Sequence, residues 1–191
     1  MTLILSHSDV RAVLDRGEVL AAVERAHADL ARGAAVVPAP PAMFLGRAAF
    51  IPMAAAAESA GAAAVKLLAD LPDNRARGLP VQRSVIVVTS AEHGGCEALI
   101  DGRLVTAVRT AAATAVATKY LARQDSSSLG LIGAGNLAVE HTRAIARVRT
   151  LDTDITLYNS VGIGLQDLAT ARLIIDKARA DGIGTEVDLS A

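Results

Sequence analysis

The ten residues 129–138, Leu-Gly-Leu-Ile-Gly-Ala-Gly-Asn-Leu-Ala, place two glycines and a small residue between an apolar run and a segment of helical character. They fit the G-x-G-x-x-A motif that binds dinucleotide phosphates, in which one glycine makes a tight turn and the next lets the backbone approach a pyrophosphate. The N-terminus of the following helix adds amide donors and a positive dipole end. The alternative is an ordinary tight strand-to-helix turn. The predicted phosphate loop comprises Gly133, Ala134, Gly135, Asn136, Leu137 and Ala138.

A complete dinucleotide-binding domain needs more than a strand at 129–132, this loop and a helix to about Arg149. A second strand, ending in an acidic residue about twenty residues after the glycines, holds the ribose hydroxyls. Asp152 and Asp154 lie at that distance, but they precede the strand-like Ile155–Tyr158. Such a domain has roughly 100–150 residues, and the rest of the chain shows no further alternation of strands and helices. Residues 126–150 are therefore expected to form only the first β-α unit of a Rossmann domain.

The chain before the glycine loop predicts a sheet with helices, so the expected fold class is α/β. The β-branched run Ser84–Thr89 predicts a central strand, and a glycine turn leads to a partner strand at Glu97–Ile100. Ala62–Ala69 predicts another strand. An alanine-rich helix is expected from Arg109 to Arg123. Further predicted elements are two amphipathic helices from a cap at Ser8-Asp9 to Gly33, short strands at Val36-Val37, Met43–Leu45 and Ala48–Met53, and a helix at Leu165–Arg179.

Lys66 is one of three lysines in the chain and stands alone among apolar residues of the strand predicted at Ala62–Ala69. An ammonium group there must reach solvent, pair with an anion or lower its pKa. Two interpretations stay open. Lys66 is a functional lysine, or it lies on the solvated face of an edge strand.

Arg109 is placed at the start of the alanine-rich helix, with Thr106 and Thr110 close by. Its guanidinium fork and the helix N-terminus together suit a carboxylate. The alternative is an arginine at an interface or on the surface.

Composition excludes several classes of protein. The 19 Lys and Arg residues against 20 Asp and Glu give a net charge of −1, so no basic excess favours nucleic acid. The N-terminal residues lack the pattern of a secretory signal, and the longest apolar stretches are interrupted by Glu58 and Lys66, which indicates a cytoplasmic protein that does not cross a membrane. The single cysteine, Cys96, and four scattered histidines predict neither a disulfide nor a metal site.

Six motifs, taken in order, resemble the pattern of the ornithine cyclodeaminase/mu-crystallin family. The resemblance covers nearly all of residues 1–150, and the block around Arg109 joined to the glycine loop is its most specific part. A later segment, Ile155–Gly162 with Gln166-Asp167-Leu168, is similar to the C-terminal part of this family, which packs back on the N-terminal domain. The six motifs are Ala64-Val-Lys66-Leu, the loop Asn74–Pro80, Leu99-Ile-Asp-Gly102, Leu104–Ala113, Lys119–Arg123 and Leu129–Gly135.

The resemblance implies an enzyme that uses NAD or NADP at the α-carbon of amino or imino acids, by cyclising deamination, dehydrogenation or ketimine reduction. Lys66 and Arg109 would bind the substrate carboxylate, and Lys66, near the imine, would be catalytic. Thr110 would join the phosphate loop in binding the cofactor. Residues 1–125 with 152–191 would form a substrate-binding and dimerisation domain, and the chain would be a homodimer built through its sheet and alanine-rich helix.

Two departures from the family pattern matter. Pro38-Ala-Pro-Pro41 stands where a further carboxylate-binding arginine often follows a proline, which makes ornithine a less suitable substrate. The family's catalytic aspartate and ribose-binding acid lie between segments that match Arg149 and Asp152, and here those segments abut. A skipped stretch of sequence, an engineered deletion or a natural one would each account for this.

Three interpretations of the function stay open. The first is an NAD(P)-dependent amino-acid enzyme, and the second is a non-catalytic remnant that dimerises or binds a small ligand. The third is a compact Rossmann-like unit in which Ile155–Tyr158 pairs parallel with residues 129–132.

Overall fold

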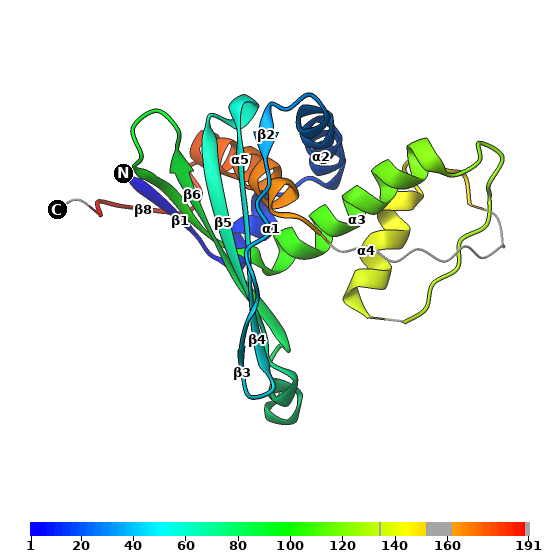
Figure 1. Ribbon diagram of the computed structural model, residues 1–191, viewed down its shortest axis with the longest axis horizontal. Coiled ribbons are helices and arrows are strands. Elements are labelled where there is room, and N and C mark those ends of the chain that lie inside the picture. Colours follow the sequence, from blue (N-terminus) through cyan, green and yellow to red (C-terminus); the bar gives the residue numbers. More distant parts are fainter. Residues whose placement is uncertain (134, 152–161, 190–191) are drawn as a thin grey trace.

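A single twisted sheet organises the molecule, and helices cover one of its faces (Figure 1). The computed structural model describes residues 1–133, 135–151 and 162–189. In the sheet, the strands follow the order β2-β4-β5-β6-β7-β1-β8, and β3 pairs with β4 outside this path. The strands are β1 (Thr2–Leu5), β2 (Ala35–Val36), β3 (Met43–Leu45), β4 (Ala48–Ala57), β5 (Ala62–Asp70), β6 (Gln82–Ser90), β7 (Cys96–Asp101) and β8 (Thr185–Val187).

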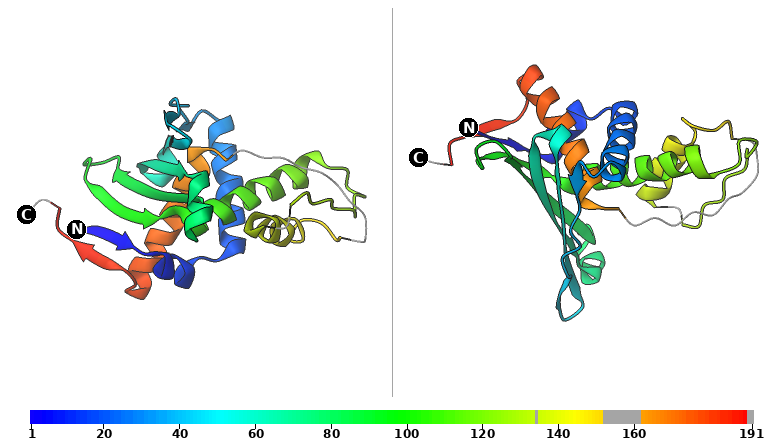
Figure 2. Two further views of the ribbon diagram at one scale, coloured as in Figure 1. Left: turned by 90° about the horizontal axis from the view of Figure 1, so that it is seen from below. Right: turned by 45° about the horizontal axis from the view of Figure 1, so that its top comes forward.

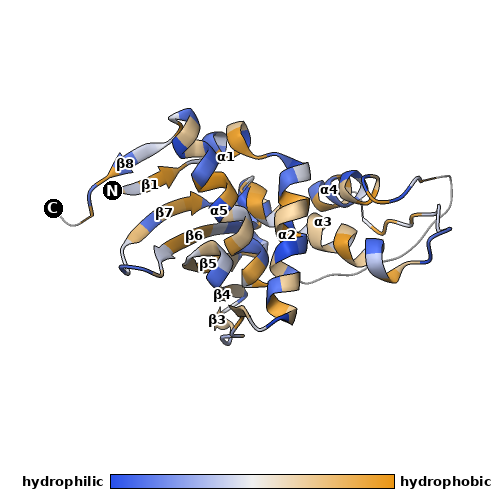
Figure 3. Cartoon of the chain, turned by 90° about the horizontal axis from the view of Figure 1, so that it is seen from above, coloured by the Kyte–Doolittle hydropathy of each residue, from blue (hydrophilic) through white to orange (hydrophobic). Residues whose placement is uncertain are grey.

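A central strand was predicted at the β-branched run Ser84–Thr89, with further strands at Ala62–Ala69 and Glu97–Ile100, and the structure confirms all three as β6, β5 and β7. β6 pairs antiparallel with β5 on one side and with β7 on the other. Because side chains alternate across a strand, every second residue of these strands faces the helices. Figure 3 shows hydrophobic residues along β1, β6 and β7, which lie side by side.

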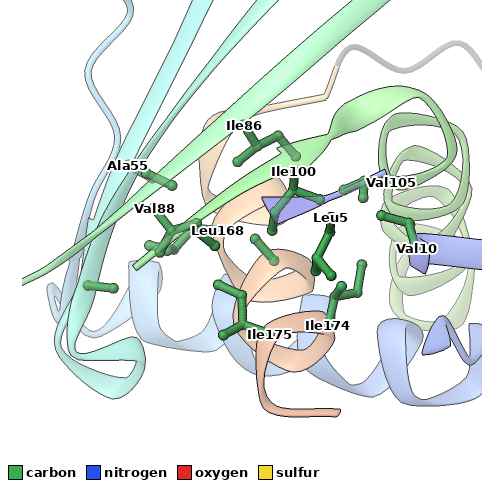
Figure 4. Close-up of a cluster of buried hydrophobic side chains, with 14 of the residues drawn as sticks. Leu5, Val10, Ala55, Ile86, Val88, Ile100, Val105, Leu168, Ile174 and Ile175 are labelled. Atoms are coloured by element: carbon green, nitrogen blue, oxygen red, sulfur yellow. The ribbon is translucent and has the colours of Figure 1, made fainter. Parts of the chain in front are cut away.

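Five α-helices lie in the described parts of the chain, and α5 is the one that packs most on the sheet. The main core lies between α5 and the inner face of the sheet, where Ile86 and Ile100 meet Leu168 and Ile175 (Figure 4). The helices are α1 (His7–Val13), α2 (Arg16–Ala31), α3 (Gly102–Leu121), α4 (Asn136–Ile145) and α5 (Gly164–Asp181).

Helix α1 begins slightly earlier than the expected cap. Ser6, not Ser8, is the N-cap: the Asp9 amide donates to the Ser6 hydroxyl over 3.3 Å, and the Ser6 amide donates to the Asp9 carboxylate over 2.9 Å. This reciprocal pair is a capping box, which satisfies two amides that the helix leaves unpaired. The second predicted helix is confirmed as α2, which is capped by Asp15.

Helix α3 begins at Gly102, well before the predicted start at Arg109. The Asp101 side chain caps it by accepting from the amide of Arg103. Gly102 allows this start because a Cβ there would overlap the Ser84 hydroxyl oxygen. The C-terminal half of α3 extends away from the sheet and packs against α4 (Figure 1).

The prediction of a strand at residues 129–132 is wrong. These residues form no strand, and Ile132 is 86% exposed. A strand needs a neighbour to satisfy its backbone groups, and no described strand lies beside this run. The helix that follows ends at Ile145, short of Arg149. Asp152, Asp154 and Ile155–Tyr158 lie outside the described residues.

Two short strands were missed, β1 with four residues and β8 with three. β1 pairs parallel with β7 and antiparallel with β8, so the two ends of the described chain lie side by side (Figure 2). Such strands are too short to show a period. No helix in the described parts of the chain is long and apolar enough to cross a membrane.

Candidate functional site

Three charged side chains from three elements meet between the sheet and the helices. Lys66 of β5, Arg109 of α3 and Asp167 of α5 are each at most 3% exposed. The Lys66 ammonium lies 2.9 Å from Asp167 Oδ1 and 2.8 Å from Oδ2. Arg109 Nε donates to the same Oδ1 over 2.8 Å. One carboxylate therefore holds two cations whose sequence positions lie far from its own.

The local sequence accounts for the position of each group. Lys66 has the same parity as the buried Ala62 and Ala64, so it faces the helices. Arg109 follows Thr106 by three residues, so both lie on one face of α3. Asp167 belongs to the first turn of α5, where the helix dipole favours a negative charge.

This geometry excludes the surface alternatives for both cations. β5 lies between β4 and β6, so Lys66 is not on a solvated edge strand. Arg109 lies two turns inside α3 and is buried, so it is not a surface residue, and the helix N-terminus is not beside it. The role of Lys66 and Arg109 in binding substrate stays a prediction.

The charges of the cluster do not balance. Lys66 and Arg109 bring two positive charges and Asp167 one negative, which leaves a surplus of one positive charge. Burial lowers the pKa of Lys66 to about 8; the negative charge of Asp167 opposes this shift, and the positive charge of Arg109 adds to it. Lys66 is therefore mostly protonated at neutral pH. A buried cation without a full partner is costly, so the cluster favours a further anion.

Among the described residues, the far edge of the Arg109 guanidinium has only neutral partners. Nη1 donates to the Gln166 side-chain oxygen over 3.1 Å, and Nη2 lies 3.9 Å from the sulfur of Met53, a weak acceptor. A carboxylate accepts two parallel hydrogen bonds from such an edge. The cluster therefore has the hydrogen-bond donors that a carboxylate needs.

Further polar groups continue the cluster on both sides. The Gln166 amide donates to His27 Nε2 over 3.1 Å, and burial lowers the pKa of His27. On the other side, Lys66 donates to the Thr106 hydroxyl over 3.4 Å.

Sequence reasoning gave no role to Asp167, Gln166, Met53 or His27. Gln166-Asp167 was noticed only as part of a family-like segment. A usable signal was present, because this acid and amide stand among the apolar residues of an otherwise core-facing helix turn.

The segment that leads into α5 packs closely over the cluster. A Cβ on Gly162 would overlap Arg109 Nη1, and one on Gly164 would lie 2.5 Å from the carbonyl oxygen of Ala54. These two glycines let the chain pass between Arg109 and β4. The cluster is consequently closed in this structure.

The glycine loop lies apart, at the N-terminus of α4. Gly133 has a φ of +101°, which favours glycine, and Gly135 is the N-cap of α4 with no side chain bonded to the helix amides. Nothing lies within 4 Å of a Cβ built on either residue. Asn136 and Leu137 are exposed and Ala138 is half-buried, while Ala134 lies outside the described residues.

A dinucleotide fits these residues only in part. The open helix N-terminus suits a pyrophosphate. The strand that normally carries the loop is not formed, and Asp152 and Asp154, the acids at the spacing expected for a ribose, lie outside the described residues. Thr110 is buried in α3, where its hydroxyl donates to the carbonyl of Thr106 over 2.7 Å. The described residues also contain no group of three His, Cys, Asp or Glu side chains that could hold a metal ion.

Comparison with known proteins gives a consistent result. The model of the ornithine cyclodeaminase/mu-crystallin family matches residues 1–153. An alanine dehydrogenase of Archaeoglobus fulgidus is 35% identical over 147 residues, which cover 77% of this chain and 45% of that protein. A Δ1-pyrroline-2-carboxylate reductase of Bacillus cereus is 35% identical over 107 residues, which cover 56% of this chain and 33% of that protein. The chain thus spans less than half the length of these relatives.

A solved structure shares the fold. The Δ1-pyrroline-2-carboxylate reductase of Thermococcus litoralis, in complex with NADH and L-proline, has a TM-score of 0.89 and 23% identity, and the match covers 97% of this chain and 100% of that chain.

Proposed function

Because the chain belongs to the ornithine cyclodeaminase/mu-crystallin family, we propose that it forms the carboxylate-binding part of an NAD(P)-dependent enzyme acting at the α-carbon of amino or imino acids. The observation that carries this proposal is the buried pair of cations, Lys66 and Arg109, with a single carboxylate between them. The relatives named alanine dehydrogenase and pyrroline-carboxylate reductase support the substrate class.

In this proposal the substrate carboxylate binds the Nη edge of Arg109 and displaces the weak contact with Met53. Lys66 supplies the second positive charge. Its lowered pKa, about 8, suits an amine that donates or accepts a proton near neutral pH. The same ammonium would lie beside the nitrogen on the α-carbon and exchange a proton with it.

NAD or NADP would accept or supply the hydride. Its pyrophosphate would bind the open N-terminus of α4, and Thr110 of α3 would join in binding the cofactor, as the resemblance to the family implies. The residues that we assign to the pyrophosphate are Gly133, Ala134, Gly135, Asn136, Leu137 and Ala138.

The second candidate function is a non-catalytic member of the family that keeps the carboxylate site. Residues 129–132 form no strand in the structure, and this favours it, because a cofactor loop normally rests on a strand at the centre of a sheet. This candidate predicts carboxylate binding without hydride transfer.

Under both candidate functions, we propose that the chain forms a homodimer through its sheet. The face of the sheet away from the helices carries apolar residues in register across five strands. Val65 is 49% exposed and Val85 is 44% exposed there. Exposed apolar area of this kind marks an interface. One register row across this face contains Ala54, Val65, Val87, Leu99 and Ile4.

Calorimetric titration with L-proline tests the carboxylate site, and pyrrolidine is the matched ligand without a carboxylate. The expected result is binding of L-proline and none of pyrrolidine. Replacing Arg109→Lys keeps the charge but removes the fork, and it should weaken binding by roughly tenfold or more. Arg103→Lys, an exposed change on the same helix, should leave it unaltered. Equal binding of both ligands, or an unchanged affinity in Arg109→Lys, contradicts the proposal.

Absorbance at 340 nm with NADH and Δ1-pyrroline-2-carboxylate then separates the two candidates. Steady oxidation of NADH supports the enzyme. Carboxylate binding without oxidation supports the non-catalytic protein.

A further inference from the structure

Resting on the proposed carboxylate site, we propose that Asp167 is its positioning residue: it keeps Lys66 charged and orients Arg109 so that the Nη edge faces neutral groups and not a carboxylate of the described residues. Asp167 is 1% exposed and lies in the first turn of α5, far in sequence from both cations. Its contacts are the ones that fix where the two cations lie.

The geometry supports both parts of this role. Asp167 Oδ1 accepts from Lys66 Nζ over 2.9 Å and from Arg109 Nε over 2.8 Å, so a single oxygen sets the distance between the two cations. Arg109 uses Nε for this bond, which is the inner side of its guanidinium. Nη1 and Nη2 then face Gln166, Met53 and the backbone at Gly162, which are neutral groups that must move aside for a carboxylate to bind this edge.

The other described neighbours of Lys66 carry no negative charge that could keep its amine protonated. On the sheet its neighbours are Met53 of β4 and Ile86 of β6, which bring no charge. From α3 it faces Arg109, a second cation, and the neutral Thr106. From α2, the titratable His27 reaches the cluster only through Gln166. Asp167 is the one carboxylate that the ion pairs of the described residues place beside Lys66.

The test is a ligand-free titration of the lysines by carbon NMR, with label at the ε-carbon. The chain has three lysines, and Lys119 and Lys177, in exposed ion pairs with Glu24 and Glu18, serve as internal references. Lys66 should titrate near pH 8 in the unchanged protein. In Asp167→Asn, which keeps the shape but removes the charge, this midpoint should fall by roughly one pH unit or more.

The control variant is Asp176→Asn on the same helix. Asp176 pairs with Arg172 and is 63% exposed, so the Lys66 midpoint should not move. A Lys66 midpoint that stays the same in Asp167→Asn overturns the inference. So does an equal fall in Asp176→Asn, because this would show a general effect of the helix.

A second measurement covers the case in which Asp167→Asn does not fold. Asp167→Ala opens space beside the two cations, and added formate can supply the missing carboxylate. We expect formate to raise the melting temperature of Asp167→Ala by several degrees relative to its effect on the unchanged protein. We also expect the double variant Lys66→Met/Asp167→Asn to fold better than Asp167→Asn alone. Neither effect is expected from a residue that only packs, so the absence of both overturns the inference.

Failure of this inference and failure of the proposed function give different results. If the unchanged protein binds no L-proline, the proposed function fails, while the lysine titration still reports on Asp167. If L-proline binds and Lys66 titrates alike with and without Asp167, the function stands and the positioning role is wrong.

Discussion

Lys66 shows how burial can turn a common residue into a chemically useful one. In water a lysine amine with an ordinary pKa is almost wholly protonated at neutral pH. Among apolar strands, burial lowers the pKa of Lys66 to about 8, and only Asp167 opposes this effect strongly. The amine therefore titrates close to physiological pH while it still faces a carboxylate.

This shift predicts opposite pH trends for binding and for stability. The folded state has the lower lysine pKa, about 8 against 10.5, so between these values the unfolded chain binds more protons and the contribution of Lys66 to stability rises with pH. Binding of L-proline should fall over the same range, because the ammonium is lost. Calorimetry for binding and urea unfolding for stability, from pH 7 to pH 10.5, measure both.

Lys66→Met isolates this contribution from the other groups that titrate in the same range. The free energy of unfolding is measured against pH for both proteins. Subtracting the curve of Lys66→Met from that of the unchanged protein should leave only the rise in stability that comes from Lys66. Lys177→Met, at an exposed ion pair, is the matched control and should keep both trends. Binding that stays constant through the whole range would contradict the role of the ammonium.

The two cations of the site could be selected from the sequence, whereas their shared anion could not. A lysine in an apolar strand and an arginine in an alanine-rich helix are conspicuous within a few residues of local sequence. Asp167 is separated from Lys66 by 101 positions and from Arg109 by 58, so only the packing of α5 on the sheet brings them together. The same holds for His27, which one glutamine joins to the cluster.

At the scale of elements, the contact between α5 and β4 depends on a glycine. A Cβ at Gly164 would lie 2.5 Å from the Ala54 carbonyl oxygen, which belongs to the backbone and cannot rotate away. Gly164→Ala should therefore push the start of α5 off the sheet and lower the free energy of unfolding by about 1–3 kcal/mol. Urea unfolding measures the loss. An unchanged stability would show that α5 does not pack as described.

In the glycine loop, by contrast with Gly164, we expect an added methyl group to affect cofactor binding and not stability. Gly135 has a φ of −84°, and a methyl group added there would have no other atom within 4 Å, so Gly135→Ala should leave the stability unchanged. If the loop binds a pyrophosphate, the added methyl group lies where the phosphate must approach, and NADH should bind several-fold more weakly. Fluorescence titration with NADH measures this. Equal affinity for NADH in both proteins would remove Gly135 from the cofactor site.

Elements were predictable where a strand or helix shows its period and unpredictable where pairing decides. β5 is an apolar run of nine residues with one lysine, β6 contains a β-branched run, and α5 repeats apolar positions over 18 residues. β1 and β8 are too short for a pattern and form because they pair with strands far away in the sequence: β1 lies between β7 and β8, and β8 is the edge strand beside β1. Residues 129–132 have strand-like composition but no described partner, which is why propensity alone overpredicted them.

At the scale of the whole molecule, the sheet is covered on one side only. Helices α5, α3 and α1 pack on its inner face, and the outer face leaves Val65, Leu67 and Val85 between 38% and 49% exposed. A lone sheet with one bare apolar face would associate indiscriminately. The proposed second copy, covering this face through a two-fold axis, would remove the apolar surface from water and close the assembly.

Val65→Glu tests this arrangement, because Val65 lies at the middle of the outer face with Ala54 and Val87 beside it in register. The unchanged protein should elute as a dimer, and light scattering should give twice the chain mass of 19.6 kDa. A buried carboxylate without a partner is costly, so Val65→Glu should return the mass to that of one chain. Val139→Glu on α4 makes the same change at a site of similar exposure, 45%, and should leave the dimer intact. If the unchanged protein is a monomer, or if both variants dissociate alike, the sheet face is not the interface.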